Sequence, residues 1–372
     1  MYELRTGPPR RARLLLATLA VAALGSLATA GSAVALPAHF WGVVPQVPPS
    51  VQVLQRLKRG GVDSIRVPVS WGSVQPERPG EWDWSDADAL IGAAAAARLN
   101  VLPFLSTAPG WAVHTDRSFG SPENLPVRTA KQRSGWKRFV TEAIHRYGPN
   151  GAFWRENPQL PPRPIHIWQV WNEPNFKYFV ARPNPAEYGK LVKLTYATAK
   201  AADPGAQLIL GGLFSRPIEA TFHVRPPQAY FASTFLQQLY ASTPGIKSKF
   251  TGIALHPYTG SWKNLSPRIE EVRRVLVANH DAAKDLYITE MGWSSEPHQP
   301  HNSFAKGLSG QARELKGAFR LLSSNQRRWH LQGVYWFSIG DYAGLCNFCG
   351  GSGLFHESKP KPAWSAYMHF AR

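Results

Sequence analysis

The apolar positions of the chain fall into eight short runs, separated by longer segments with helical periodicity. The runs are dense in Val, Ile and Leu and lack clean alternation with polar residues, which is typical of parallel strands buried on both faces. We therefore expect strands at Phe40–Val44, Ser64–Val69, Asn100–Leu105, Ile165–Trp171, Gln207–Leu213, Gly252–His256, Leu286–Glu290 and Leu331–Phe337.

Between these runs, apolar residues recur at the spacing of one face of a helix. One of the segments opens with Asn184 before Pro185, a typical helix start. The predicted helices are Val51–Arg59, Ala87–Arg98, Ala130–Tyr147, Pro185–Ala202, Ala229–Tyr240, Pro267–His280 and Ser309–Asn325.

This order of elements predicts an α/β protein, a single-domain (β/α)8 TIM barrel that spans residues 36–372. An open doubly wound sheet is the alternative. If it bound a dinucleotide, it would need a glycine-rich phosphate loop after an early strand. Gly211-Gly212 ends a strand but lacks the rest of that fingerprint.

Residues 1–35 have the layout of a secretory signal peptide, with small residues after an apolar stretch from Leu14 to Leu24. Cleavage is expected after Ala35, with Ala30 as second choice. An uncleaved anchor is the alternative, but the stretch is shorter than the roughly 20 residues that span a bilayer. We expect a secreted or cell-surface protein without a stable membrane span after cleavage. The arginines that precede the stretch are Arg5, Arg10, Arg11 and Arg13.

The formal charge is +18, which bears on partners and solubility and not on the fold. The basic residues are scattered without an RRM, zinc-finger or helix-turn-helix pattern, so we do not expect nucleic-acid binding. An anionic cell-wall or matrix polymer is a more plausible partner for an exported protein. An unspecialised basic surface is the simpler alternative.

The only two cysteines, Cys346 and Cys349, lie in one loop. In an exported protein we expect them to form a local disulfide, with a free or redox-active pair as the alternative. A four-ligand zinc site would need histidines as well, and only His356 is near in sequence. We predict neither a metal nor an organic cofactor.

Two carboxylates stand at strand ends. Glu173 follows the fourth predicted run, and Glu290 ends the seventh. Because parallel strands of a barrel deliver their carboxyl ends to one rim, both side chains should meet there. A pair of carboxylates is the minimum equipment for acid/base and nucleophilic attack on a glycosidic bond. The alternative is two structural glutamates that cap loops or pair with arginines.

Other strand ends add polar groups to this rim. Arg66 lies inside an apolar strand, so it must meet a carboxylate. Glu290 is the expected partner, which would keep Glu290 ionised, and some other acid is the alternative. Asn172 could bind a sugar 2-hydroxyl or cap backbone. Tyr258 could hydrogen-bond the nucleophile or pack at the rim, and His256 could face sugar or core. Flat apolar faces for sugar rings are expected from Trp111, Trp336 and Trp41.

These motifs resemble those of retaining glycoside hydrolases of clan A. The resemblance rests on Trp171-Asn172-Glu173-Pro174-Asn175, on the Pro-Gly-Trp-Ala turn at 109–112 and on Ile-Thr-Glu-Met-Gly-Trp at 288–293. Members carry the acid/base in an Asn-Glu pair that ends the fourth strand and the nucleophile at the end of the seventh. The chain is most similar to glycoside hydrolase family 39 and related bacterial exopolysaccharide hydrolases, with family 5 second, from about residue 40 to 364.

The resemblance implies a retaining O-glycoside hydrolase that acts on a polysaccharide or oligosaccharide by double displacement. Glu173 would be the acid/base and Glu290 the nucleophile. Two departures keep the substrate open. Family 5 enzymes usually present a histidine where this chain has Ser106-Thr107, and there is no room for the β-sandwich of many family 39 enzymes. We expect endo action. The alternative function is a non-catalytic carbohydrate-binding or cell-wall protein on a barrel scaffold.

Overall fold

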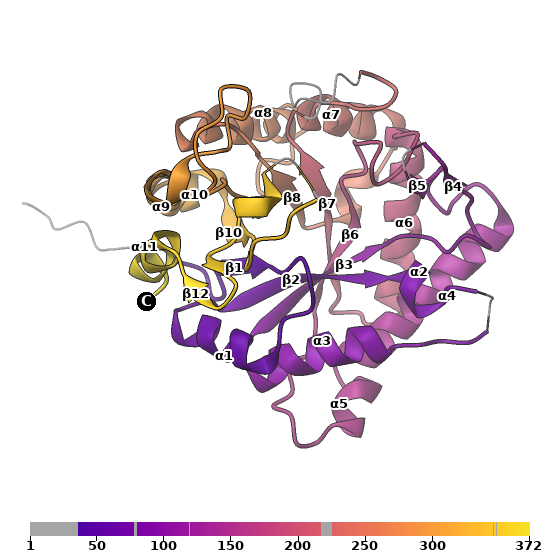
Figure 1. The fold of residues 1–372 in the computed structure, drawn as a ribbon. Coiled ribbons are helices and arrows are strands. Elements are labelled where there is room, and N and C mark those ends of the chain that lie inside the picture. The colour runs from indigo at the N-terminus through magenta and orange to yellow at the C-terminus, as the bar shows by residue number, and fades with distance from the viewer. Residues whose placement is uncertain (1–35, 78–79, 119, 217–224, 345, 347) are drawn as a thin grey trace, which may run out of the picture. The chain divides into compact units, whose positions relative to one another are not determined.

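The protein folds into a closed barrel of eight parallel strands wrapped by helices (Figure 1). The computed structural model describes residues 36–77, 80–118, 120–216, 225–344, 346 and 348–372. Neighbouring strands follow the order β1-β10-β9-β8-β7-β6-β3-β2. Their bounds are β1 Trp41–Val44, β2 Ser64–Ser70, β3 Asn100–Ser106, β6 Ile167–Asn172, β7 Gln207–Phe214, β8 Gly252–His256, β9 Asp285–Met291 and β10 Leu331–Phe337. The predicted (β/α)8 barrel is confirmed, and so is each predicted strand.

A longer helix follows each barrel strand. These helices are α1 Val51–Arg59, α3 Ser85–Ala96, α4 Ala130–Tyr147, α6 Pro185–Ala202, α7 Ala232–Ser242, α8 Leu265–Ala278, α9 Gly307–Ser324 and α11 Pro362–Ala371. The sequence patterns predicted seven of them and missed α11, which packs against α9. Shorter elements are α2 Trp71–Val74, α5 Ala152–Glu156, α10 Gln326–Trp329, the 3-10 helices Ile246–Lys249, Trp262–Asn264 and Cys349–Gly351, and the strand pairs β4 Thr115–Asp116 with β5 Ser121–Pro122 and β11 Phe355–His356 with β12 Lys359–Pro360.

Side-chain caps fix the start of three of the longer helices. Ser50 caps α1, and Asn184 caps α6, where Pro185 occupies the first turn. At α4, Thr129 and Gln132 form a capping box in which each side chain accepts from the other residue's backbone N–H. Such caps satisfy amide groups that have no partner within the helix. These three helices have the bounds that the sequence predicted.

The apolar core has two main parts, beside a small cluster of Phe176 and Ala229. A large outer core lies between the barrel and its helices. A smaller inner core fills the barrel itself, with Tyr287 and Tyr335 among its members. Because successive strand residues point to opposite faces, the barrel strands other than β2 contribute to both apolar cores in turn. This alternation decides which side chains can reach the carboxyl-end rim.

Of the described residues, no helix combines the length and apolar character that crossing a bilayer requires. The predicted signal peptide and its cleavage sites fall within residues 1–35, outside the described part of the chain.

Candidate active site

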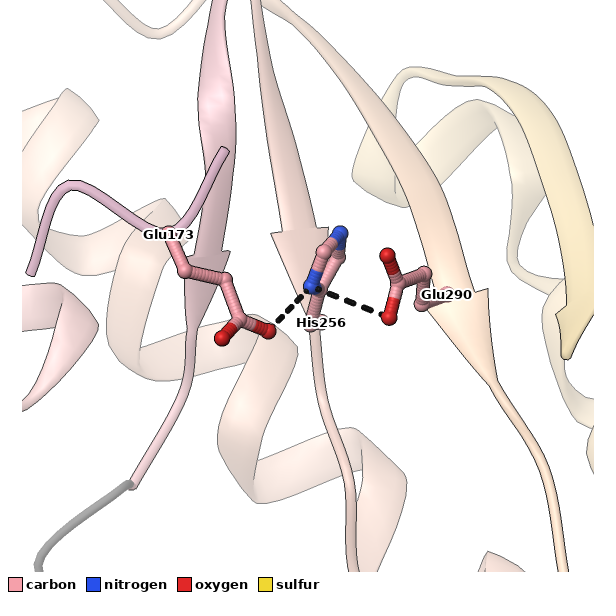
Figure 2. A group of neighbouring side chains, drawn as sticks. All are labelled: Glu173, His256 and Glu290. Carbon is pink, nitrogen blue, oxygen red and sulfur yellow. Dashed lines mark hydrogen bonds and ion pairs between the residues drawn. The ribbon is translucent and has the colours of Figure 1, made fainter. Parts of the chain in front are cut away.

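Glu173 and Glu290 meet at the carboxyl ends of the strands, on either side of His256 (Figure 2). Glu173 directly follows β6, Glu290 is the next-to-last residue of β9, and His256 ends β8. The imidazole Nδ1 lies 2.6 Å from Glu173 Oε1 and 3.5 Å from Glu290 Oε2. One oxygen of each carboxylate and one imidazole nitrogen all lie within 4.8 Å of one another. The sequence-predicted pair therefore shares one site.

Arg66 of β2 binds Glu290 from inside the barrel. Its side chain is fully buried, and Nη1 donates to Glu290 Oε1 at 2.7 Å. Nη2 donates to Asn172 Oδ1 at 2.5 Å, and Nε donates to Gln169 Oε1 at 2.9 Å. The guanidinium also lies over the Phe104 ring, 4.2 Å from its centroid. The expected contact of Arg66 with Glu290 is confirmed, and its three acceptors hold the guanidinium in one orientation.

A distortion of β6 brings Asn172 into the site. Gln169 and Asn172 both bind Arg66 although they are three positions apart, and residues at that spacing in a regular strand point to opposite faces. Between them Trp171 adopts a φ of 69°, which is uncommon outside glycine. Gln169 Nε2 donates to the Trp171 carbonyl at 2.8 Å. Since Arg66 occupies Asn172 Oδ1, the Asn172 amide Nδ2 is left to donate to a ligand.

Two glycines of β7 make room for these groups. A Cβ on Gly211 would lie 2.6 Å from the Val170 carbonyl oxygen, and a Cβ on Gly212 would lie 2.0 Å from His256 Nε2. Glycine is needed wherever backbone or a side chain approaches so closely. Gly211 and Gly212 supply no functional group to the site, and their contribution is space.

Tyr258 reaches Glu290 from the loop after β8. Its hydroxyl donates to Glu290 Oε2 at 3.0 Å, so the expected hydrogen bond is confirmed. The ring lies among four phenylalanines at centroid distances of 5.2–6.2 Å: Phe214, Phe304, Phe337 and Phe348. The second oxygen of Glu290 is therefore held by a phenol in a largely apolar setting.

The surroundings shift the protonation of the buried groups. Burial raises the pKa of Glu173 well above its ordinary value, and the negative charge of Glu290 adds to the rise. Burial also raises the pKa of Glu290, but the Arg66 guanidinium and the Tyr258 hydrogen bond oppose that rise. Burial and the charge of Arg66 lower the pKa of His256 well below its ordinary value. The arrangement thus favours a proton on Glu173, a charge on Glu290 and a neutral imidazole.

The sugar-stacking role predicted for three tryptophans is wrong for two of them. Trp336 is fully buried next to Trp293 and Phe319. Trp41 is 4% exposed and stacks on Phe319 of α9 at 4.2 Å. The physical reason is the strand alternation, because Tyr335 faces the barrel interior and its neighbour Trp336 must face the helices.

Trp111 remains a candidate, although the structure gives it no contact with the carboxylates. It is half-buried, packs edge-on against Trp71 at 5.4 Å, and its indole nitrogen donates to the Gln75 carbonyl at 2.9 Å. The ammonium group of Lys131 lies 5.6 Å from the centre of its ring. A role in sugar binding is therefore still a prediction for Trp111.

Cys346 and Cys349 form a disulfide, as predicted, with their Cα atoms 5.1 Å apart. The Cys349 carbonyl accepts from the backbone amides of Tyr342 and Ser352. Trp336 Nε1 in turn donates to the Ser352 carbonyl at 3.1 Å. The disulfide thus belongs to the loop that follows β10 at the rim.

Glu173, His256 and Glu290 are also the donors that a divalent cation could use here, with one nitrogen and two carboxylates. The fixed positive charge of Arg66 contacts Glu290 and would oppose a cation at that carboxylate. The donor set therefore suits proton chemistry better than metal binding.

Gln169, Phe104 and Phe348 are not among the site residues predicted from the sequence. Gln169 could have been found, because a buried amide inside the run Ile167–Asn172 needs a polar partner, as Arg66 does. Phe104 and Phe348 carry no comparable signal, since phenylalanine is ordinary in strands and loops of a core.

No protein-family model matches the sequence, and the search of curated proteins finds no match. Solved structures match in fold. A family 39 glycoside hydrolase from the gut symbiont Bacteroides cellulosilyticus shares 20% identity at a TM-score of 0.61, with 90% of this chain aligned to 64% of that chain. For a GH39 β-xylosidase from Caulobacter crescentus the identity is 19% and the TM-score 0.62, over 90% of this chain and 72% of that one.

A GH5_18 protein from Bifidobacterium longum, solved in complex with Manβ1-4GlcNAc, has 14% identity and a TM-score of 0.62, over 90% of this chain and 78% of that one. At such identities the likeness shows the fold alone. This chain spans just under two thirds of the length of the Bacteroides enzyme. The families named by these structures, 39 and 5, are the two that the sequence motifs resemble.

Proposed function

We propose that this protein is a retaining glycoside hydrolase with Glu173 as acid/base and Glu290 as nucleophile. The observation that carries the proposal is the short separation of the two carboxylates, whose facing oxygens lie within 4.8 Å. Retention requires carboxyl groups about 5–5.5 Å apart, whereas inversion leaves roughly 6.5–9.5 Å for a water molecule. The solved structures of similar fold, which include family 39 and family 5 proteins, support the same reading.

The site supplies each step of a double displacement. Glu290 is kept ionised by Arg66 and Tyr258 and attacks the anomeric carbon, while Glu173 gives its proton to the departing glycosidic oxygen. Glu173 then takes a proton from water, which displaces Glu290 and restores both carboxyl groups. Asn172 would donate through Nδ2 to the sugar 2-hydroxyl. No step in this sequence needs a metal or an organic cofactor, so dialysis against EDTA should leave the activity unchanged.

The substrate is a polysaccharide or oligosaccharide. The solved structures of similar fold include a β-xylosidase and a complex with Manβ1-4GlcNAc, so xylosides and mannosides belong in the first panel. Aryl glycosides and polysaccharides should be tested by reducing-sugar assay, and an active substrate followed by NMR. We expect the anomeric configuration of the first product to be retained. Inversion would refute the mechanism while leaving the barrel untouched.

Single substitutions separate the two roles. Glu290→Ala should abolish turnover of every substrate, because no covalent intermediate can form. Glu173→Ala should spare aryl glycosides whose leaving group needs no proton, and added azide should yield a glycosyl azide of retained configuration. Glu142→Ala, at an exposed position of α4, is the matched control and should hydrolyse small aryl glycosides as the wild type does.

The other outcome of this experiment is a non-catalytic glycan-binding protein. This function would be established if no substrate in the panel were hydrolysed and if Glu290→Gln left glycan binding unchanged.

We also propose that the protein is exported, on the strength of the signal-like residues 1–35. The secreted form should begin at Leu36, which intact-mass analysis of culture medium can measure. An unprocessed Met1 on secreted material would contradict the cleavage.

A further inference from the structure

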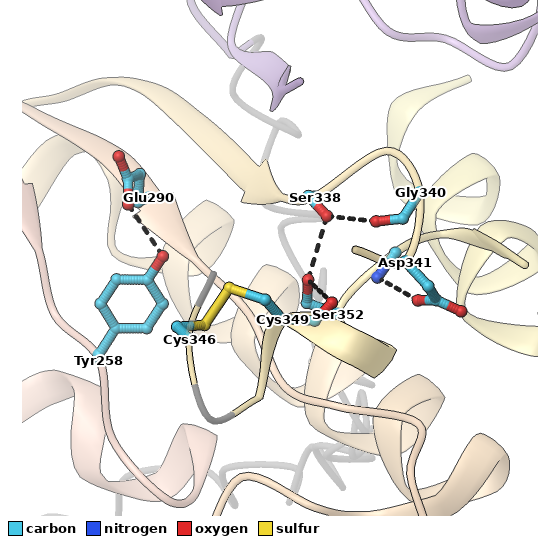
Figure 3. Close-up of a disulfide and its surroundings, with 9 residues drawn as sticks. Tyr258, Glu290, Ser338, Gly340, Asp341, Cys346, Cys349 and Ser352 are labelled. Atoms are coloured by element: carbon cyan, nitrogen blue, oxygen red, sulfur yellow. Dashed lines mark hydrogen bonds between the residues drawn. A yellow bond between two sulfur atoms is a disulfide. The ribbon is translucent and has the colours of Figure 1, made fainter. Parts of the chain in front are cut away.

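The disulfide loop after β10 reaches the ring of Tyr258, the residue that binds Glu290 (Figure 3). Cys346 and Cys349 are three positions apart, so their disulfide closes a short loop, and the Cys349 amide also donates to the Cys346 carbonyl at 3.3 Å. Phe348 lies between the two cysteines in sequence, and its side chain is only 8% exposed. A covalent ring of this size leaves the backbone of Phe348 few conformations.

Phe348 makes the closest aromatic contact of Tyr258. Their ring centroids are 5.2 Å apart, whereas Phe214 lies at 5.6 Å and both Phe304 and Phe337 lie at 6.2 Å. Phe348 itself stacks on Phe304 at 4.7 Å with an interplanar angle of 20°. The disulfide loop is thus connected to Glu290 through two rings in contact and one hydrogen bond.

We propose that Phe348 is a positioning residue for the reaction, held by the Cys346–Cys349 disulfide against Tyr258 so that the phenol stays directed at Glu290 Oε2. The inference rests on the proposed function for its catalytic consequence. Tyr258 is only partly buried, and without Phe348 its ring would lose its nearest neighbour. A phenol that samples more positions spends less time as a donor to Glu290, whereas a fixed ring is preorganised.

The consequence is a change in the acidity of the nucleophile. The groups that face Glu290 are Arg66 from β2, Glu173 after β6, His256 at the end of β8 and Tyr258 in the loop that follows it. The Tyr258 hydrogen bond acts to lower the pKa of Glu290. When that bond weakens, the pKa rises and Glu290 ionises only at higher pH. In the pH profile of kcat/KM, the acidic limb should then move to higher pH. The fall in kcat should be larger than the change in KM.

Phe348→Leu is the main test, because leucine stays apolar but removes the ring. On the acidic limb of the pH profile we expect kcat/KM to fall about three- to ten-fold, the effect expected from the loss of one hydrogen bond. The limb itself should move to higher pH. Phe348→Tyr keeps the ring and should restore the wild-type limb. The control Phe355→Leu removes a buried ring that packs on Trp364 and not on Tyr258, and should leave the limb in place.

The disulfide can be tested separately, since the chain has no other cysteines. Dithiothreitol should move the acidic limb of the wild type in the same direction as Phe348→Leu. The same reductant should have no effect on the variant with Cys346→Ser and Cys349→Ser, which should already show the displaced limb. An unchanged limb in folded Phe348→Leu, or in reduced wild type, overturns the proposal.

A second measurement does not depend on turnover. Carbon-13 NMR titration of labelled glutamate carboxyls, assigned to Glu290 with Glu290→Gln, should give a higher pKa in Phe348→Leu than in the wild type. If no glycoside is hydrolysed but this shift appears, the proposed function fails and the positioning by Phe348 stands. If glycosides are hydrolysed and the shift is absent, Phe348 does not position Tyr258.

Discussion

Glu173 is 6% exposed and holds a carboxyl group whose pKa is raised by burial and by Glu290. A carboxyl group that is more basic in the folded state than in the unfolded state makes stability depend on pH. Below the ordinary value of 4.5 both states keep the proton and no stability is lost. As pH rises from there through the raised pKa, the unfolded state releases its proton more easily and folding becomes less favourable.

Glu173→Gln should therefore stabilise the protein, because the amide keeps the shape of the protonated acid and never ionises. The Tm of this variant should exceed that of the wild type by about 2–4 °C at pH 8, the shift that roughly 1 kcal/mol produces in a larger domain. The difference should shrink towards pH 4. Thermal unfolding followed by circular dichroism across this range measures it.

The exposed Glu142→Gln is the control for this comparison and should show no pH-dependent gain. If the difference in Tm between Glu173→Gln and the wild type stayed constant from pH 4 to pH 8, the pKa of the Glu173 carboxyl would not be perturbed by folding. Gain of stability on removal of an active-site group is a common trade between stability and activity.

At the level of elements, β7 and β8 can pack closely at His256 because Gly212 has no side chain. Gly212→Ala would place a methyl group 2.0 Å from His256 Nε2, so the imidazole must leave its place beside Glu173. We expect a loss of stability of about 1–3 kcal/mol from overpacking and a loss of most activity on substrates that need a proton from Glu173. Urea unfolding and kcat/KM on a polysaccharide measure the two effects.

Gly205→Ala is the control for Gly212→Ala. Gly205 lies in the turn before β7, where the nearest atom to an added Cβ is a flexible carboxylate oxygen at 3.1 Å. This variant should retain activity. Full activity in Gly212→Ala would mean that the position of His256 does not matter to the reaction.

Helix boundaries were predictable where a side chain fixes them. The bounds of α1, α4 and α6 agree with the sequence prediction, and each of these helices has a side-chain cap from Ser50, Thr129 or Asn184. The helices α3, α7, α8 and α9 lack such a cap and begin two or three residues away from the prediction. Periodicity locates a helix, but a cap is needed to locate its first residue.

Side-chain direction was less predictable than strand position. The contact of Arg66 with Glu290 could be predicted, because an unpaired charge in a strand is costly. The directions of Trp41 and Trp336 depend on which residue of each strand faces inward, and apolar runs without alternation do not show this. The left-handed φ of Trp171, which turns Asn172 inward, has no signal in residue type.

At the scale of the whole molecule, some of the basic residues lie together around a hollow beside α4. The hollow is lined by Ala130, Arg133, Ser134, Lys137, Arg138, Thr141, Glu142 and Leu194. Neither Lys137 nor Arg138 forms an ion pair with another described residue. We propose that this surface contributes to retention on an anionic cell-wall or matrix polymer, which the positive net charge that remains after loss of residues 1–35 would assist.

Reversing both charges, with Lys137→Glu and Arg138→Glu, should weaken retention on an anionic polysaccharide column. The variant should elute at lower salt, while kcat on a small neutral glycoside stays unchanged because α4 does not supply the catalytic carboxylates. The control reverses two exposed charges on α9, with Arg313→Glu and Lys316→Glu. Equal loss in both variants would assign retention to net charge and not to the α4 hollow.

Because the guanidinium of Arg66 is buried, its positive charge needs a negative charge close by at every step of the proposed cycle. Before attack, one negative charge lies on Glu290 beside Arg66. When Glu290 becomes an ester it loses that charge, but Glu173 has then given up its proton and carries an equal one. His256 lies between the two carboxylates, so the negative charge moves only a few ångströms. The interior never has to hold an unbalanced Arg66, and water need not enter to solvate it.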